Sequence, residues 1–426
     1  MKSNVVLVVA DTLRKDYSEG LDKLLDLGFV KYDYAFSTSP WTLPSHVSMF
    51  TGLFPSQHGV HEYFGLNDLV EDYGRLGKQA MSRFDNLTSL LMDEGYTTIG
   101  VTANWLITPI YGFNFDEFYF IPYPPLYVLN SELYNFIRSR FKESKLRLIL
   151  DMAKKRMFKE LGTMVMSYID YYYLSRTLHK GCNLILKVLD KLDLSDQFFL
   201  FINEMEAHEP YSRDMTGWIG SISKYEYSFL KSVLYGLADD YTISHFKRYY
   251  PIHAKNSTSC VNKIITKLSR RTDLDKTLII VTSDHGQHIG EQGRVGHGYY
   301  LSDELIRVPL YVKYPRDTRP DLKIKQQDVS LTAIYYLIKS IVYDETLILG
   351  DVILSESYGV QVPFKTVKSL FSIDEQALKR LYGYKVRISQ GDGYIIYDVD
   401  RDEVIETKGH VDAEYVRKKL KEITNQ

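Results

Sequence analysis

The sequence predicts an α/β protein with a largely parallel central sheet, followed by a small antiparallel sheet. Short apolar runs rich in Val, Ile, Phe and Thr, separated by longer segments with helical spacing, favour the first part. Short alternating stretches broken by Asp and Gly after about residue 350 favour the second. The 426 residues are too many for one typical core, so we expect a large domain over 1–345 and a smaller one over 346–426.

Five short apolar runs are the expected strands of the large domain, because each has the length and the residue content of a buried strand. In chain order they are Asn4 to Val9, Thr97 to Thr102, Phe198 to Asn203, Leu278 to Thr282 and Pro309 to Lys313. Over about residues 125–194, apolar residues recur at helical spacing among many lysines and arginines, which predicts a helical insertion. Its basic charge fits either a surface for anions or a solvated helix face.

The C-terminal part alternates polar and apolar residues over Tyr384 to Ile388 and over Gly393 to Asp398, which predicts strands of the smaller sheet. A charged helix is expected from Ala413 to Ile423. No segment approaches the roughly 20 apolar residues that span a bilayer. Met1 leads directly into the first strand, without the longer apolar region of a signal peptide. We therefore expect a soluble, cytoplasmic protein with no membrane span.

The net charge bears on possible partners, and the cysteine content bears on disulfides, zinc sites and the redox compartment. The formal net charge of -2 gives no general attraction to nucleic acid, so no nucleic-acid partner is expected. Cys182 and Cys260 are the only cysteines, which excludes a disulfide framework and a four-cysteine zinc site. Two cysteines make a reducing compartment the default expectation. The oligomeric state stays open.

Polar and titratable residues follow four of the expected strands at the point where each strand ends. They are Asp11, Asn104, Glu206 with His208, and Asp284 with His285. Because ligands of open α/β sheets bind beyond the carboxyl ends of the strands, these side chains are expected to converge in one cleft. The alternative is that they collect there because strand ends border solvent.

Thr42 stands just before an expected helix over His46 to Thr51, and Pro44 suits the first turn of that helix. A helix N-terminus presents unpaired N–H groups and the positive end of the dipole, which favour an anionic substrate. The hydroxyl of Thr42 needs a divalent cation to become a nucleophile at neutral pH. The alternative is that Thr42 is an ordinary N-cap residue.

Two carboxylates and one imidazole, from Asp11, Asp284 and His285, are ligands that hard or borderline divalent ions take. Gly286 follows directly and indicates a turn, on which the adjacent residues 284 and 285 can reach one ion. Mn²⁺, Zn²⁺, Mg²⁺ and Ca²⁺ all stay open. Oxygen ligands suit Mg²⁺ or Ca²⁺, whereas the imidazole favours Mn²⁺ or Zn²⁺.

Four stretches carry a family resemblance when they are taken together. They run from Asn4 to Arg14, from Ser39 to Gly59, from Phe198 to Tyr211 and from Thr282 to Pro309. In this order and spacing they resemble the sulfatase family of the alkaline phosphatase superfamily. The resemblance covers most of the large domain outside the insertion. It implies an alkaline-phosphatase-like three-layer sandwich with a mostly parallel central sheet and a small C-terminal antiparallel sheet.

The resemblance also implies roles for individual residues. The ligands of a divalent metal ion would be Asp11, Thr42, Asp284 and His285. The substrate-binding or supporting residues would be Arg14, His46, Asn104 and Glu206. Thr42 would also be the nucleophile, while His208 and His297 would contact the transferred group or protonate the leaving oxygen. Glu206, together with these two histidines, would suit a second ion.

Thr42 and His46 depart from the sulfatase pattern, in which a cysteine or serine is oxidised to formylglycine and an arginine follows four residues later. Oxidation of a threonine would give a ketone rather than an aldehyde, so this protein cannot use the hydrated aldehyde of formylglycine as its nucleophile. Thr12 replaces a second metal-binding aspartate and removes one negative charge. An unmodified threonine is the nucleophile of superfamily members that transfer phosphoryl groups, so the resemblance implies a covalent phospho-threonine.

Three functions are compatible with these residues. The leading one is a metal-dependent hydrolase that cleaves or transfers a phosphate mono- or diester through Thr42, with a small anionic ester as substrate. The second is a sulfuric ester hydrolase. The third, of another class, is a catalytically silent protein that binds an anionic glycan or lipid head group. Retention of the predicted metal and histidine residues argues against the third, because buried polar groups are costly to keep.

Overall fold

The computed structural model describes residues 3–65, 68–122, 129–130, 145–158, 161–162, 179–195, 197–211, 218–219, 222–350, 353–374, 376, 379 and 381–411. Most of the predicted insertion over 125–194 lies outside these residues. Within that range the structure describes β5 (Leu129–Asn130), α6 (Lys145–Lys154) and α8 (Cys182–Leu189). The helix predicted from Ala413 to Ile423 also lies outside the described residues.

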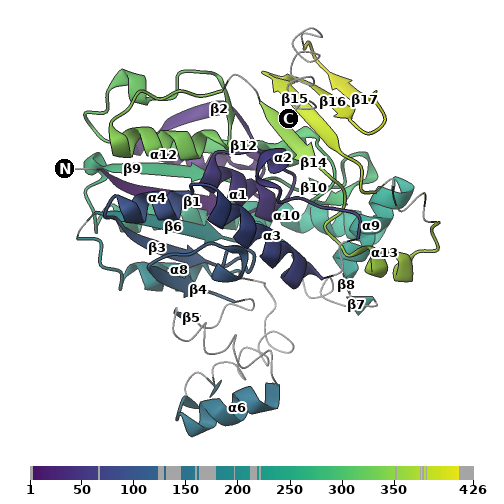
Figure 1. The fold of residues 1–426 in the computed structure, drawn as a ribbon, viewed down its shortest axis with the longest axis horizontal. Helices are drawn as coiled ribbons and strands as arrows, with labels where there is room; N and C mark the ends of the chain where they lie inside the picture. The colour runs from purple at the N-terminus through teal and green to yellow at the C-terminus, as the bar shows by residue number, and fades with distance from the viewer. Residues whose placement is uncertain are drawn as a thin grey trace.

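A nine-stranded, mostly parallel sheet forms the centre of the large domain, in the order β13-β2-β12-β9-β1-β6-β3-β4-β5 (Figure 1). The five predicted strands are confirmed with small differences at their ends. They are β1 (Asn4–Ala10), β3 (Thr97–Thr102), β6 (Phe198–Glu204), β9 (Thr277–Thr282) and β12 (Arg307–Lys313). The first four are mutually parallel where they pair, whereas β12 runs antiparallel to β9.

Four strands of this sheet escaped the sequence analysis. They are β2 (Val30–Phe36), β4 (Glu117–Phe120), β5 and β13 (Asp328–Ser330). All four lie toward the two ends of the sheet. The first half of β2 is partly exposed and carries Lys31 and Asp33, so it lacks the continuous apolar run that marks a strand covered on both faces.

Helices cover both faces of the sheet and make the three layers that the sequence predicts. Val5, Leu7 and Val9 of β1 face one core, which contains residues of α1 (Thr42–Thr51), α3 (Leu69–Arg83), α4 (Leu87–Asp93) and α12 (Ala333–Tyr343). Val6 and Val8 face the other core, with residues of η2 (Glu19–Leu27), α8 and α10 (Asp240–Leu268). Because β1 is buried on both faces, its sequence reads as an unbroken apolar run.

A four-stranded antiparallel sheet near the C-terminus confirms the predicted second sheet and lies to one side of the large sheet in Figure 1. Its strands are β14 (Leu354–Ser357), β15 (Lys385–Gln390), β16 (Gly393–Asp398) and β17 (Glu403–Lys408). Buried Arg387 joins it to the large domain, because its guanidinium donates to Asp303 Oδ1 at 2.6 Å and to the Leu301 carbonyl at 2.9 Å. The boundary between residues 345 and 346 stays a prediction.

The remaining elements are short helices and two-stranded ribbons around the two sheets. They are η1 (Lys15–Tyr17), α2 (Pro55–His58), η3 (Pro109–Tyr111), β7 (Trp218–Ile219), β8 (Ile222–Ser223), α9 (Lys224–Tyr235), η6 (Leu274–Lys276), β10 (His288–Ile289), η7 (Glu291–Gly293), β11 (Val295–Gly296), α11 (Asp303–Ile306), η8 (Pro320–Leu322) and α13 (Phe364–Leu370). Among the described residues, no helix has the length and apolar character needed to cross a membrane.

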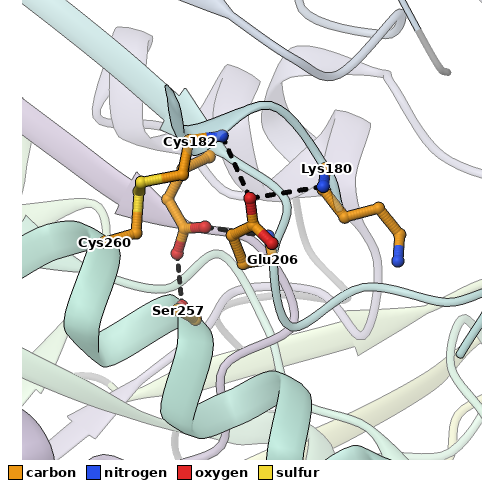
Figure 2. The surroundings of a disulfide bond; sticks show 6 residues. Lys180, Cys182, Glu206, Ser257 and Cys260 are labelled. Carbon is orange, nitrogen blue, oxygen red and sulfur yellow. Dashed lines mark hydrogen bonds between the residues drawn. A yellow bond between two sulfur atoms is a disulfide. The ribbon is translucent and has the colours of Figure 1, made fainter. Parts of the chain in front are cut away.

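Cys182 and Cys260 form a disulfide that joins the first residue of α8 to α10 (Figure 2). The start of α8 is held from a second side, because Oε1 of Glu206 accepts hydrogen bonds from the backbone N–H of Lys180 and of Cys182. Disulfides are rare in reducing compartments. The pairing therefore departs from the default expectation drawn from two cysteines, and the cellular location stays a prediction.

Reduction of this disulfide should lower the free energy of unfolding by about 2–4 kcal/mol, because the bond closes a loop with a sequence separation of 78 in the unfolded chain. Urea unfolding with and without dithiothreitol measures the effect. The double variant Cys182→Ser, Cys260→Ser is the matched control, and its free energy of unfolding should be the same with and without dithiothreitol. Equal stability of the wild-type protein with and without reductant would contradict the expectation.

Candidate active site

Four parallel strands deliver polar side chains to the same edge of the sheet. The registers align Val9 of β1 with Asn203 of β6 and with Thr282 of β9, so the segments that follow these strands start side by side. Asp11 directly follows β1, and Asp284 comes two residues after the end of β9. The site therefore lies beyond the carboxyl ends of the central strands, where ligands of open α/β sheets bind.

Asp11 and Asp284 are both completely buried, and their hydrogen bonds come from neutral donors. Asp11 Oδ2 accepts from the side-chain amides of Asn104 at 2.7 Å and Asn203 at 3.3 Å. Asp284 Oδ1 accepts from the backbone N–H of Thr12 at 3.1 Å and from that of residue 285 at 2.9 Å. The other oxygen of each carboxylate, Asp11 Oδ1 and Asp284 Oδ2, has no hydrogen-bond partner among the described residues, although His285 Nε2 lies 3.4 Å from Asp284 Oδ2.

His285 completes a group in which one ligand atom from each of Asp11, Asp284 and His285 lies within 4.8 Å of the others. The Nδ1 atom of His285 donates to the Gly286 carbonyl at 2.9 Å, so its Nε2 keeps a lone pair for a ligand. A glycine is required at 286, because a Cβ there would lie 2.0 Å from the carbonyl oxygen of Glu304. This close approach fixes the turn that carries both ligands.

The protonation of these groups reflects their burial. Burial raises the pKa of Asp11 to about 6, and the charge of Asp284 adds to the shift. Burial also raises the pKa of Asp284 to about 6 and lowers that of His285 to about 4. Two acceptor oxygens without partners, beside a neutral imidazole, are the donor set that a divalent cation takes. The residues present therefore fit a metal ion.

Thr42 is the first residue of α1, and Trp41 is the N-cap. The side chain of Trp41 makes no capping hydrogen bond. The Oγ1 atom of Thr42 lies 3.2 Å from His285 Nε2. Thr42 is buried in the first turn of α1, whose N–H groups have no partners within the helix. The hydroxyl thus lies beside the predicted metal ligands at a helix N-terminus.

Thr12 adopts a left-handed backbone conformation with a φ of 58°. A β-branched residue there is strained by about 1–3 kcal/mol. The conformation lets the Thr12 N–H donate to Asp284 Oδ1, the contact described above. Strain is thus stored at the position where the sequence departs from the sulfatase pattern.

Three of the predicted substrate-binding residues make hydrogen bonds to neighbouring protein groups of the site. Asn104 binds Asp11 through its amide and orients that carboxylate. His46 is completely buried, and its Nδ1 donates to the Thr42 carbonyl at 2.9 Å; burial lowers its pKa to about 3. Arg14 donates to the carbonyl of Gln287 at 3.0 Å and pairs with Asp16 and Glu291. Nε2 of His46 has no hydrogen-bond partner among the described residues.

Glu206, the fourth predicted substrate-binding residue, turns toward α8 rather than toward the predicted metal ligands. Its carboxylate accepts from the backbone of Lys180 and Cys182, as Figure 2 shows. Glu209 instead lies between the two predicted catalytic histidines. Its carboxylate oxygens are 3.6 Å from His208 Nδ1 and 3.6 Å from His297 Nδ1.

His208, Glu209 and His297 form a second group whose ligand atoms lie within 4.8 Å of one another. The rings of His208 and His297 have centroids 5.2 Å apart, and that of His297 lies 4.6 Å from that of His285. Burial opposes the charged form of His208, but the carboxylates of Glu209 and Asp11 outweigh it and raise its pKa. Burial lowers the pKa of His297 well below 6.5. The surroundings of the two neighbouring imidazoles therefore shift their pKa values in opposite directions.

The sequence analysis missed three residues of the site: Asn203, Glu209 and Gln287. Asn203 is the last residue of the strand predicted over 198–203, and a polar residue at the end of a buried strand was a usable signal. Glu209 follows His208 directly, but nothing in the sequence distinguishes it from Glu206. Gln287 comes directly after the glycine of the metal-binding turn.

Comparison with known proteins shows the family of this chain. The sulfatase family profile matches residues 3–341. The chain belongs to the sulfatase family. Members of this family and its structural neighbours are hydrolases of phosphoric or sulfuric esters, and the family is generally metal-dependent. The fold, the family and the enzyme class predicted from the sequence are thereby confirmed.

Solved structures show the same fold at low sequence identity to this sulfatase-family protein. A phosphonate monoester hydrolase of Agrobacterium radiobacter is 16% identical with a TM-score of 0.59, over 100% of this chain and 96% of the other. One from Silicibacter pomeroyi is 14% identical with a TM-score of 0.55, over 100% and 94%. A 2-O GAG sulfatase is 11% identical with a TM-score of 0.54, over 100% and 91%. Phosphonate monoester hydrolases and a sulfatase therefore share this fold.

A divalent cation should stabilise this protein more at pH 8 than at pH 5. Protons compete with the cation below the pKa of about 6 of Asp11 and Asp284. Without a cation, these carboxyls reduce stability as the pH rises through about 6, because their folded pKa lies above the unfolded value of 3.8. A cation at 100 times its Kd adds about 2.7 kcal/mol.

Thermal unfolding with Mn²⁺ and with EDTA at the two pH values measures this difference. The double variant Asp11→Asn, Asp284→Asn should lose the response to Mn²⁺. Asp317→Asn, which changes an exposed carboxylate, should keep it. Equal stabilisation of the wild-type protein at pH 5 and pH 8 would show that these carboxyls do not bind the cation.

Proposed function

We propose that this protein cleaves or transfers a phosphate mono- or diester through a covalent intermediate on Thr42. The observation that carries the proposal is an unmodified threonine at the first position of α1, with Oγ1 3.2 Å from Nε2 of His285. A threonine cannot form the aldehyde hydrate on which sulfatases with formylglycine depend. Its oxygen can attack phosphorus directly, as activated hydroxyl nucleophiles do.

Asp11, Asp284 and His285 would hold the cation, and the imidazole favours Mn²⁺ or Zn²⁺ over Ca²⁺. A bound divalent ion lowers the pKa of a neighbouring hydroxyl and offsets charge on the transferred group. Thr42 Oγ1 then releases its proton to solvent and forms a bond to phosphorus while the bond to the leaving oxygen breaks. Water or an acceptor alcohol attacks the phospho-threonine in the second step, which releases the phosphoryl group and restores the hydroxyl. N–H groups of the first turn of α1 stabilise the charge on the equatorial oxygens.

His208 is the proton donor to the leaving oxygen in this proposal. Its Nδ1 donates to the Glu209 carbonyl at 2.7 Å, and the neighbouring carboxylates raise its pKa despite burial. The imidazolium form therefore persists to higher pH than for an isolated histidine, and its Nε2 carries a proton. His46 does not share this role, because its Nδ1 is held by the Thr42 carbonyl and burial keeps it neutral.

A sulfuric ester is the second candidate substrate. The family profile supports it, and a sulfate group has the tetrahedral shape and anionic oxygens that a helix N-terminus also accepts. The fold does not separate the two, because both hydrolase classes share it. The ratio of kcat/KM for p-nitrophenyl phosphate, bis-p-nitrophenyl phosphate and p-nitrophenyl sulfate, measured with Mn²⁺, decides between them. A higher value for the sulfate would replace the leading proposal.

Thr42→Val should lower kcat/KM at least about 1,000-fold, because it removes the nucleophile and keeps the shape of the side chain. Thr42→Ser keeps a hydroxyl at the same place and should retain measurable turnover. Acid quenching during turnover of a ³²P-labelled ester should leave label on the wild-type protein and on none of the Thr42→Val protein. Wild-type activity in Thr42→Val would reject Thr42 as the nucleophile.

His208→Gln should slow hydrolysis of a phenyl or alkyl phosphate by roughly 100–10,000-fold, since these leaving groups need a proton. The loss should be smaller for p-nitrophenyl phosphate, whose leaving group is stable as an anion. His58→Gln, which changes a buried histidine of α2, should leave the ratio of the two rates unchanged. A loss in His208→Gln that is equal for both esters would argue against His208 as the acid.

A further inference from the structure

Gln287 is a completely buried residue that joins the two histidine-bearing segments of the site. Its backbone is fixed at both ends: its N–H donates to the Glu304 carbonyl at 3.0 Å, and its carbonyl accepts from Arg14 Nη1 at 3.0 Å. Its side-chain amide lies between Glu209 and His297. Nothing in the proposed chemistry has yet used this residue.

The orientation of the Gln287 amide follows from its neighbours. An ionised carboxylate can only accept hydrogen bonds, so the amide nitrogen must face Glu209, and Nε2 donates to Glu209 Oε2 at 2.8 Å. The amide oxygen then faces His297, with Oε1 2.7 Å from Nδ1. An amide oxygen carries no proton. The proton of this hydrogen bond must therefore be on Nδ1 of the imidazole.

Glu209 reinforces the same assignment from a second direction. Its Oε1 lies 3.6 Å from His297 Nδ1, so two acceptors and no donor face that nitrogen from these side chains. In a neutral imidazole only one nitrogen carries a proton, and the partner of one nitrogen determines the state of the other. His297 is buried between the imidazoles of His208 and His285, with ring centroids 5.2 and 4.6 Å away, and this crowded, buried position favours an uncharged ring.

We propose that Gln287 is a positioning residue that holds His297 in the tautomer protonated on Nδ1, so that Nε2 presents a lone pair to the site. The lone pair lies on the opposite side of the ring from Gln287. It can accept a proton or a hydrogen bond, or bind a cation. It cannot give a proton to a leaving oxygen.

This assignment deepens the proposed function, on which its catalytic consequence rests, by dividing the work of the two histidines. The family resemblance gave His208 and His297 one shared role. Both Nδ1 atoms donate to a carbonyl oxygen and lie 3.6 Å from a Glu209 oxygen, but the two rings have different neighbours. The ring of His297 lies against that of His285, with centroids 4.6 Å apart, whereas the charge of Asp11 acts on His208. His208 then supplies the proton to the leaving oxygen, and His297 accepts the proton of the hydroxyl that attacks the phospho-threonine.

Ring ¹⁵N chemical shifts of the full-length protein test the tautomer without any need for turnover. Long-range ¹H–¹⁵N spectra of protein labelled with ¹⁵N-histidine, at pH 8 with MgCl₂, distinguish a protonated from an unprotonated ring nitrogen. Among the 11 histidines, the signal of His297 is the one that disappears in His297→Asn. We expect a protonated Nδ1 and an unprotonated Nε2. The reverse pattern in the wild-type protein would overturn the proposal whether or not a Gln287 variant folds.

Two substitutions of Gln287 distinguish the effect of its hydrogen-bond acceptor from the effect of its side-chain volume. Gln287→Met has a similar length but loses the amide acceptor, so the Nε2-protonated form of His297 should become populated. Gln287→Glu keeps an oxygen acceptor toward His297 and should keep Nδ1 protonated. Tyr211→Phe is the matched control, since it removes a buried hydroxyl that contacts the Gln287 amide without changing the contact with His297. An unchanged His297 signal in Gln287→Met would show that Gln287 does not set the tautomer.

Activity is a separate measurement. Gln287→Met should lower kcat by about 10-fold or more, with a smaller change in KM, and Gln287→Glu should restore part of the loss. If the wild-type protein shows the expected tautomer but turns over none of the esters, the proposed function fails while the role of Gln287 stands. If it is active but Nδ1 is unprotonated, the role of Gln287 fails alone.

Discussion

Two buried carboxylates whose hydrogen bonds come only from neutral donors are the constraint on which the site depends. Asp11 and Asp284 each leave one oxygen unsatisfied, and the donors that reach their other oxygens are all neutral. An unpaired buried charge is among the most expensive features a fold can carry. A divalent cation bound to them would remove that cost, and would tie the stability of this edge of the sheet to the proposed chemistry.

The residues behind the reacting groups explain why the site holds its shape. Amide side chains do much of this work, because an amide offers a donor and an acceptor in one rigid plane. Asn104 and Asn203 orient Asp11, and Gln287 links Glu209 to His297. Such outer contacts fix the tautomers and directions of the groups that touch a substrate or a metal. The residues proposed to react are thus different from the amide residues that orient them.

The central strands and most of the site residues could be predicted from the sequence. These strands are buried on both faces, so each is a continuous apolar run followed by polar residues. The half-exposed strand β2 carries no such signal. Even the contact between His46 and the Thr42 carbonyl agrees with helical spacing, since residues four apart face each other.

Other features depend on tertiary contacts. A turn after β6, in which the His208 N–H donates to the Met205 carbonyl, directs Glu206 to α8 and leaves Glu209 between the histidines. Two acidic residues close to one histidine cannot be told apart before that turn is known. The pairing of Cys182 with Cys260 likewise depends on how α8 lies against α10.

The position of β1 in the sheet has a consequence for biosynthesis. Strand β1 pairs on one edge with β6 and on the other with β9, both of which are translated much later than β1. At about 5–20 residues per second, the chain from Ala10 to Phe198 takes ~10–40 s to emerge. Throughout that interval a wholly apolar strand has neither neighbour. The nascent chain therefore needs shielding of its first residues, by chaperones or by transient local contacts, before the catalytic edge can form.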